Sequence, residues 1–200
     1  MRKPISNLLI DHLMKLNLRQ FLELNNGETK MPNNTLNEVT IETNTNEEQE
    51  ILALQILKND LGIGKGTFDF EGIIPMPKEI KKSAEISIED FLNGEDAPDG
   101  YENINGHYVP KDLVVRNKLI KDHGADNWYD WSCNNWGTKW NAYEVEVHQD
   151  KESILEIDFS TAWDSPRGVV EKIFDYCQDH NLALSWVATH EGEEGFEQII

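Results

Sequence analysis

The chain has 200 residues, of which 38% are hydrophobic, so it is long enough and apolar enough to build one core of ordinary size. Its 18 lysines and arginines stand against 37 aspartates and glutamates, which gives a formal net charge of −19. A field this acidic repels phosphate backbones and disfavours direct binding of nucleic acid, and no stretch of sequence is apolar enough to predict a membrane span.

The acidity is unevenly distributed along the chain. Residues 1–30 carry five basic and three acidic side chains, a balance of 5 − 3 = +2, whereas residues 31–200 carry 13 and 34, a balance of 13 − 34 = −21. Residues 4–24 place apolar side chains near helical spacing, and Asn25-Asn26-Gly27 supplies a stop signal. We therefore predict an amphipathic helical extension over 1–30 and a domain over 31–200. Met31 offers a second start, so the extension docks on the domain, joins two subunits or precedes the true beginning.

The predicted domain begins with a strand followed by a helix. Leu36–Thr43 alternates apolar and polar residues, which is typical of a half-buried strand. Thr45-Asn46-Glu47-Glu48 has the form of a capping box, and the apolar residues of Ile51–Leu57 recur at helical spacing. Gly62 and Gly64 then end the helix.

A long segment over about 62–139 interrupts this pattern, and we interpret it as an insertion with its own helices. Helical pieces are predicted around 86–93 and over Asp112–His123. The second of these ends at Gly124 after a basic last turn, which favours a helix C-terminus.

The remaining elements follow the insertion. Trp140–His148 and Ile154–Phe159 alternate and are separated by a short polar loop, so they are predicted to pair as an antiparallel hairpin. Ser165-Pro166 begins a helix, and Leu182–Val187 is the last strand. Without the insertion the order is strand, helix, strand, strand, helix, strand. This order predicts an α+β domain of the ferredoxin-like, split βαβ type, in which a four-stranded antiparallel sheet carries two helices on one face.

Four motifs in this order resemble those of a known family. The resemblance covers roughly residues 31–200, and it is to the YubB-type ferredoxin-like family of phages, prophages and conjugative plasmids. It rests on Met31-Pro32-Asn33, on Phe68-Asp69-Phe70 with Ile73-Ile74-Pro75-Met76-Pro77, on Asn135-Trp136-Gly137-Thr138-Lys139-Trp140-Asn141-Ala142, and on Phe159-Ser160-Thr161-Ala162-Trp163 followed by Pro166. The resemblance implies the fold and a mobile-element origin, and it implies no catalytic residues. Residues 1–30, and Asn34-Thr35 where members often have Trp-Cys, depart from the family pattern.

No motif predicts catalysis, a metal or a cofactor. Gly62–Thr67 lacks the serine or threonine directly after lysine that a phosphate-binding loop needs, and its flanks are in the wrong order. The six histidines fall into no HExxH or paired CxxC pattern. Two cysteines, Cys133 and Cys177, are too few for a disulfide framework or an iron–sulfur cluster. They are compatible with a reducing cytoplasm, which the family resemblance would make that of a bacterial host.

Tryptophans cluster at the end of the predicted insertion. Aromatic rings can stack nucleic-acid bases, but such platforms normally lie among lysines and arginines, and only Lys139 is close in sequence. We therefore predict an aromatic seam between the insertion and the sheet, with indole N–H groups bonded to backbone and a tight turn at Gly137. The seam comprises Trp128, Trp131, Trp136, Trp140 and Trp163.

Strand alternation places carboxylates on one face of the predicted sheet. Counting by two, apolar Leu155, Ile157 and Phe159 oppose Glu156 and Asp158, and the same count applies to the other strands. Tyr143, Val145 and Val147 are predicted on the opposite face from the carboxylates of their strand. Carboxylates on neighbouring strands repel, so either this is simply a solvated face or it binds a basic partner or divalent cations. The predicted partner-binding residues are Glu38, Glu42, Glu144, Glu146, Glu156 and Asp158, extended at the C-terminus by Glu191, Glu193 and Glu194.

Three functions remain open at this point. The favoured one is a non-enzymatic mobile-element protein that binds a basic host protein through the acidic face, as an inhibitor of a nucleic-acid-binding defence effector would. The second is an assembly module in which residues 4–24 mediate self-association. The third is a small-ligand or hydrolytic site walled by tryptophans and supplied by His107, His123 or Cys133.

Overall fold

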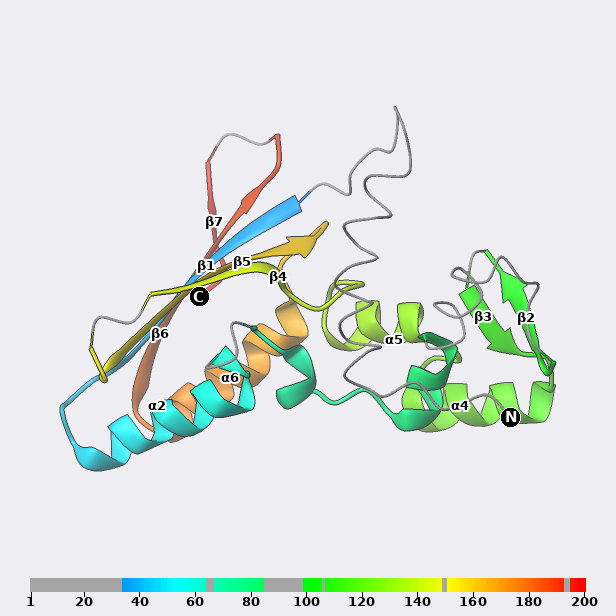
Figure 1. Ribbon diagram of the computed structural model, residues 1–200, viewed down its shortest axis with the longest axis horizontal. Helices are drawn as coiled ribbons and strands as arrows, with labels where there is room; N and C mark the ends of the chain where they lie inside the picture. Colours follow the sequence, from blue (N-terminus) through cyan, green and yellow to red (C-terminus); the bar gives the residue numbers. More distant parts are fainter. Residues whose placement is uncertain (1–33, 64–66, 85–98, 106, 149–150, 193–194) are drawn as a thin grey trace, which may run out of the picture.

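The computed structural model describes residues 34–63, 67–84, 99–105, 107–148, 151–192 and 195–200. These form an α+β structure with one antiparallel sheet in the strand order β4-β5-β1-β6-β7 and a separate two-stranded sheet, β2-β3 (Figure 1). The strands of the larger sheet are β1 (Asn34–Thr43), β4 (Tyr143–His148), β5 (Ile154–Ala162), β6 (Leu182–His190) and β7 (Glu197–Gln198). The predicted extension over 1–30 and the predicted helix around 86–93 lie outside the described residues.

Among the described residues, four α-helices and a short 3₁₀ helix accompany the sheets, and residues 78–84 are also helical. The bounds are α2 (Glu48–Asp60), η2 (Phe70–Gly72), β2 (Tyr101–Ile104), β3 (His107–Pro110), α4 (Leu113–His123), α5 (Trp128–Asn135) and α6 (Arg167–Asp179). Figure 1 shows α2 and α6 together against one face of the larger sheet, while α4, α5 and the small sheet extend to one side. The larger sheet therefore has one covered face, which we call the inner face, and one face that these helices leave uncovered, which we call the outer sheet face.

The inner face carries the hydrophobic core. Val39 and Ile41 of β1 alternate with exposed Glu38 and Glu42, as a strand with one buried face requires. The centre of the core is aromatic, and the rings of Phe68 and Phe159 stack with their centroids 4.4 Å apart. The rings of Phe70, Trp136 and Trp186 make edge contacts around this pair.

A buried polar group within this core is fully bonded. Asn37 donates to Thr35 O (3.1 Å) and Thr161 Oγ1 (2.9 Å), and its Oδ1 accepts from Ser165 Oγ (2.9 Å) and Trp186 Nε1 (3.1 Å). Burying a polar side chain is costly unless it is hydrogen-bonded, and here the donors and acceptors of the amide are matched. The inner face therefore has a single well-specified arrangement at this end of the sheet.

Side-chain hydrogen bonds fasten the insertion to the sheet. Asn141 donates to Asp69 Oδ1 (2.7 Å) and accepts from the backbone N–H of Phe70 (2.9 Å), just before η2. Trp136 Nε1 donates to Ile74 O (2.9 Å). Gly168 at the start of α6 lies so close to α5 that a Cβ there would be 1.9 Å from Asn135 O, which explains a glycine inside this helix.

Most of the predicted elements agree with the structure, with three corrections. The predicted hairpin of the second half is confirmed as the antiparallel pair β4–β5, and α4 is confirmed with Asp112 as its N-cap and Gly124 (φ 79°) after its last residue. The larger sheet has five strands in place of the predicted four, because the two residues of β7 pair with β6.

The predicted capping box is wrong in its partners. The N-cap of α2 is Glu47, two residues after Thr45, and the Thr45 hydroxyl accepts from the N–H of Glu47 (3.2 Å). The carboxylate that accepts from the Thr45 N–H is that of Glu50 (Oε2, 2.7 Å), in place of the predicted Glu48. Asn181 Nδ2 also donates to Glu50 Oε1. The backbone bond from Thr45 is the largest of the contacts that lower the pKa of Glu50 below its ordinary value of 4.5.

The predicted facing of β4 is also wrong at one residue. Register with β5 shifts between Tyr143 and Glu146, and Glu144 lies in the left-handed region with φ 53°. This bulge turns Tyr143 onto the outer sheet face, where its hydroxyl donates to Asn34 Oδ1 (2.6 Å), while Val147 remains opposite buried Ile157.

Candidate functional site

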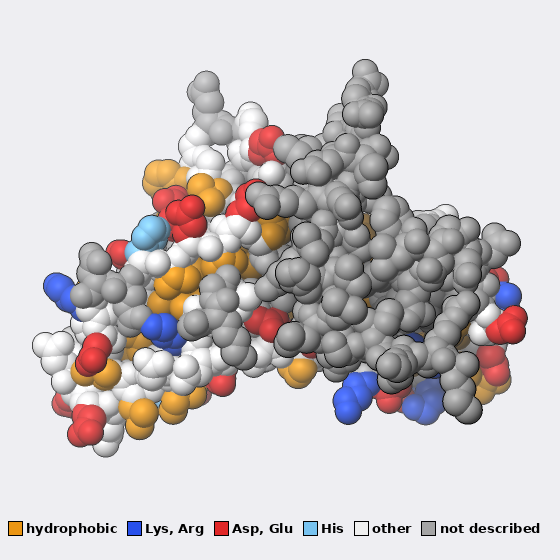
Figure 2. Space-filling view, in the orientation of Figure 1, with side chains coloured by type: hydrophobic (Ala, Val, Ile, Leu, Met, Phe, Trp, Pro, Cys, Tyr) orange, Lys and Arg blue, Asp and Glu red, His pale blue; other side chains and the backbone are white. Residues whose placement is uncertain are grey.

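The outer sheet face collects acidic side chains from three adjacent strands. Glu38 and Glu42 of β1, Glu146 of β4 and Glu156 of β5 are exposed, and Asp158 of β5 is half-buried. None of the five strands contains a lysine or arginine. The structure therefore brings the carboxylates predicted from strand alternation onto one surface, at the sheet end of the molecule (Figure 2).

Asp158 is the centre of this acidic group. It lies opposite Glu38 of β1 on one side and Glu146 of β4 on the other. Like charges directly opposite one another on neighbouring strands destabilise a sheet. His148 Nε2 lies 3.5 Å from Asp158 Oδ2, but this histidine contributes a charge only when it is protonated.

In the part of the chain that the structure describes, these carboxylates lack compensation by lysine or arginine. Among the described residues, no ion pair with either side chain involves Glu38, Glu42, Glu144, Glu146 or Glu156. Figure 2 shows lysine and arginine side chains at the end of the molecule that carries α4 and also at the opposite end, near α2. The negative field of the outer sheet face is thus directed at solvent.

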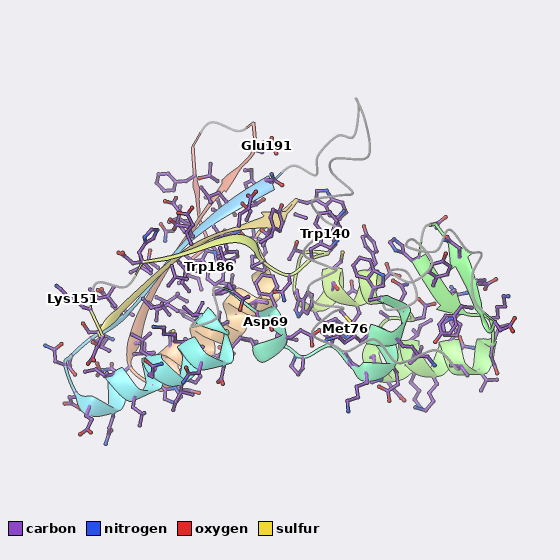
Figure 3. The ribbon with its side chains drawn as sticks, viewed as in Figure 1. Asp69, Met76, Trp140, Lys151, Trp186 and Glu191 are labelled. Atoms are coloured by element: carbon purple, nitrogen blue, oxygen red, sulfur yellow. The ribbon has the colours of Figure 1, made fainter. Side chains whose placement is uncertain are left out.

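The remaining predicted acidic residues have different roles. Glu144 accepts from Ser160 Oγ (3.1 Å) at the bulge, and Glu191 accepts from the backbone N–H of Asn34 (2.9 Å). Figure 3 shows Glu191 and Lys151 at opposite ends of the sheet. Burial, followed by these two carboxylates, raises the pKa of Tyr143 to about 12, so its hydroxyl stays neutral. Glu193 and Glu194 lie outside the described residues.

A hollow opens on the outer sheet face beside this acidic group. Its volume is about 360 Å³, and residues of β1, β6 and the approach to β7 line it. Phe196 forms one wall and is 71% exposed. The lining residues are Glu38, Thr40, Ser185, Val187, Thr189, Gly195 and Phe196. Sequence reasoning found Glu38 but not the hollow, because three segments distant in sequence form it.

The five tryptophans of the predicted seam divide into two groups. Trp131 and Trp136 are buried with their rings 5.6 Å apart, and Trp128 packs partly against the same core. Trp140 and Trp163 lie nearer the surface, and the Lys139 ammonium lies 3.7 Å and 4.3 Å from their ring centroids. Burial lowers the pKa of Lys139. Trp163 is 43% exposed and has φ 76°, an unfavourable conformation for a bulky residue.

A group of titratable side chains adjoins the tryptophans. His107 stacks on Tyr129 with ring centroids 4.2 Å apart and makes an edge contact with Trp128. Within the described part of the chain, His107 Nδ1 and Trp128 Nε1 are buried without a hydrogen-bond partner. Burial lowers the pKa of His107 and raises the pKa of Cys133. His123 belongs to the last turn of α4, away from this stack in sequence and element.

A second mixed group lies where β6, β7 and α6 meet. One ligand-type atom from each of Asp164, His190 and Glu197 lies within 4.8 Å of the others, a spacing compatible with a metal ion. Arg167 already supplies a cation, because its Nη2 donates to Glu197 (3.0 Å) and lies 3.7 Å from Asp164. Since the same carboxylates neutralise this guanidinium, we interpret the group as an ionic tie that holds β7.

Comparison with known proteins assigns no family. No family model matches the chain, and no curated protein matches it. A search of solved structures finds a crystal structure of the protein api92 from Yersinia pseudotuberculosis, described under the family DUF1281, with 11% sequence identity and a TM-score of 0.38. That match covers 84% of this chain and 94% of the other. Among the described residues, no helix has the length and apolarity to cross a membrane.

Proposed function

We propose that this is a non-enzymatic binding protein whose outer sheet face docks onto a basic region of a partner protein. The observation that carries the proposal is Asp158, flanked by Glu38 and Glu146 on neighbouring strands in a sheet without lysine or arginine. Such an arrangement costs stability in the free protein, and cationic side chains of a partner would relieve that cost.

The proposal includes the finer fold assignment. The order β4-β5-β1-β6, with α2 following β1 and α6 preceding β6, supports a ferredoxin-like unit to which β7 adds a fifth strand. In RNA-recognition modules of similar topology the open sheet face carries aromatic and basic residues, and here that face is acidic. A surface of this kind suits a protein that competes with nucleic acid for a basic channel.

We further propose a phage or mobile-element origin and a basic host defence protein as the partner. The sequence motifs at Phe68–Phe70 and Asn135–Ala142 support the first part by their family resemblance. The acidic face supports the second part, since a nucleic-acid-binding effector presents the complementary charge.

The test compares two variants of equal charge. E144Q/E146Q/E156Q/D158N neutralises four carboxylates of β4 and β5, and E48Q/E171Q/D175N/D179N neutralises four exposed carboxylates of α2 and α6. Calorimetric titration with an arginine-rich peptide measures the affinity of each at low and high ionic strength. We expect the first variant to bind roughly tenfold more weakly, because four exposed pairs each contribute a few tenths of a kcal/mol, and the second to bind like wild type. Equal weakening by both variants would mean that only net charge matters, and the sheet face would then have no role.

The partner itself is sought by capture from host lysate under the same comparison. A basic host protein should be retained by wild type and by E48Q/E171Q/D175N/D179N, and lost from E144Q/E146Q/E156Q/D158N and at high salt. Retention by all three proteins would contradict the proposal.

Small-ligand binding at the tryptophans is a second candidate. It is favoured by His107 Nδ1 and Trp128 Nε1, two buried nitrogens that lack partners among the described residues, beside the Lys139 ammonium. An unpaired buried donor is costly, and a ligand acceptor would satisfy it. A thermal-shift screen with nucleotides and small carboxylates tests this candidate. A ligand that raises the melting temperature of wild type but not of H107A would support the site, and the absence of any such ligand would exclude it.

Self-association through residues 4–24 stays a prediction. Deleting residues 1–30 and measuring the mass in solution tests it. A mass in solution that falls from that of a dimer to that of a monomer on deletion supports the role, and a protein that is a monomer both before and after deletion rules it out.

A further inference from the structure

The hollow on the outer sheet face has walls of three different kinds. Glu38 supplies a carboxylate, Thr40, Ser185 and Thr189 supply hydroxyls, and Val187 with the ring of Phe196 supplies apolar surface. Sites of this kind combine apolar lining with a few polar groups that fix the orientation of a ligand. The chemistry suits an extended group with an apolar stem and a positively charged head.

Charge selects the sign of the ligand. Glu38 has no lysine or arginine partner among the described residues, and Asp158 lies directly opposite it on β5. The carboxylate end of the hollow is therefore adjacent to the most negative part of the sheet. An anion would be repelled there, and a cation would relieve the repulsion between the two carboxylates.

The backbone that follows Phe196 is bonded to β6 and α6. Glu197 binds Arg167 (3.0 and 3.2 Å) and lies 3.4 Å from His190 Nε2. Gln198 pairs with Val187, and the N–H of Ile199 donates to Trp186 O (2.9 Å). These contacts tie the backbone that follows Phe196 to β6 and α6. The ring is thus exposed on a backbone that is anchored directly after it, which lowers the ordering cost of binding.

We propose that this hollow, here called the Phe196 subsite, binds an arginine side chain. The stem of the arginine packs against Val187 and Phe196, the planar guanidinium stacks on the ring, and its N–H groups donate to Glu38 and the hydroxyls. Arginine is chosen over lysine because its flat cation both stacks on an aromatic face and forms several directed bonds at once. The inference rests on the proposed function. Within it, this subsite would determine specificity by binding one arginine side chain of the basic partner.

Binding of a single amino-acid derivative tests the subsite without knowledge of the partner. The probe is N-acetyl-arginine amide, titrated into the full chain and followed by two-dimensional NMR. For a ligand this small we expect a dissociation constant on the order of 1 mM, with shifts confined to the amides of Thr40, Ser185 and Val187 and the ring protons of Phe196. N-acetyl-lysine amide should bind at least about threefold more weakly, and N-acetyl-norleucine amide should cause no saturable shift.

Two variants and a control complete the experiment. F196A removes the exposed ring and E38Q removes the charge while keeping the shape, and each should weaken arginine amide binding by about fivefold or more. E48Q removes an exposed carboxylate from α2 and should leave binding unchanged. Unchanged spectra elsewhere establish that each variant is folded.

The outcomes separate this inference from the proposed function. Norleucine or lysine amide binding as well as arginine amide would overturn the assignment, as would unaltered binding by F196A and E38Q. Loss of peptide binding by E144Q/E146Q/E156Q/D158N together with unaltered binding by F196A would leave the acidic face as a docking surface and remove the subsite. Arginine amide binding that F196A and E38Q abolish, in a protein whose peptide affinity the four-residue variant does not change, would retain the subsite and remove the wider face.

Discussion

The two faces of the larger sheet differ in how far their polar side chains are matched by hydrogen-bond or charge partners. On the inner face Asn37 is buried, and all of the hydrogen-bonding capacity of its side chain goes to partners in β1, β5, β6 and the residues just before α6. On the outer sheet face Asp158 lies between two further carboxylates, and its one ion-pair partner among the described residues is His148. The inner face thus has its polar groups matched within the fold, while the outer sheet face leaves like charges side by side, which is the feature on which the proposed binding function rests.

The largest expected effect lies at the centre of the inner face. Trp186→Ala removes a fully buried ring and should lower the free energy of unfolding by about 3–5 kcal/mol in a urea titration. Glu156→Gln, one strand away but on the outer sheet face, should change it by less than about 0.5 kcal/mol. Equal losses would show that the two faces are not distinct in the way described.

A smaller loss of folding stability is expected when Asn37, the side chain that all bonds of the buried polar network share, is removed. Asn37→Ala leaves Ser165 Oγ and Trp186 Nε1 without their acceptor and should cost about 2–3 kcal/mol by urea unfolding. Asn59→Ala, at an exposed position of α2, is the matched control and should cost less than about 0.5 kcal/mol. A neutral result for Asn37→Ala would mean that water replaces the lost side chain.

Glu50 tests the difference between a satisfied and an unsatisfied carboxylate. Folding lowers its pKa below 4.5, chiefly through the Thr45 N–H, so its ionised form stabilises the fold above the unfolded pKa. That contribution is lost as the pH falls through the lower, folded pKa. Glu50→Gln should therefore be less stable than wild type at neutral pH and should converge with it in acid, as measured by urea unfolding across pH. A difference that persists at the lowest pH would assign the effect to packing instead of charge.

The smallest expected effect has the opposite sign. Asp158→Asn removes the central charge of the acidic group and should raise the free energy of unfolding by about 0.5 kcal/mol at low ionic strength. Added salt should reduce the gain, since screening relieves the same repulsion in wild type. Thermal unfolding at two salt concentrations measures both values, and destabilisation by this substitution would show that Asp158 is already compensated.

Strand alternation predicted the acidic face well because its signal is local. In the central parts of β1 and β5 every second side chain is apolar, as at Val39, Ile41, Leu155, Ile157 and Phe159, and burying that set fixes the register of the pair. The bulge at Glu144 was not predictable in this way, since the sequence of β4 alternates without interruption. A two-residue strand such as β7 is too short to have a readable period.

The contacts that hold the insertion were visible in the sequence only as unusual residues. The aromatic and asparagine motifs that carry the family resemblance include Phe70, Trp136 and Asn141, and each of these contacts a segment about 60 to 70 positions away. Spacing along the chain does not reveal such partners. The Phe196 subsite was missed for the same reason, because its walls come from β1, β6 and the residues before β7.

The bulge in β4 has a consequence for the behaviour of the protein at high concentration. Open sheet edges are templates on which other chains aggregate. Here one edge is distorted by the left-handed residue Glu144, and the other is formed by only two paired residues. We expect these two blunted edges to disfavour strand-to-strand association between copies of the protein in a concentrated solution.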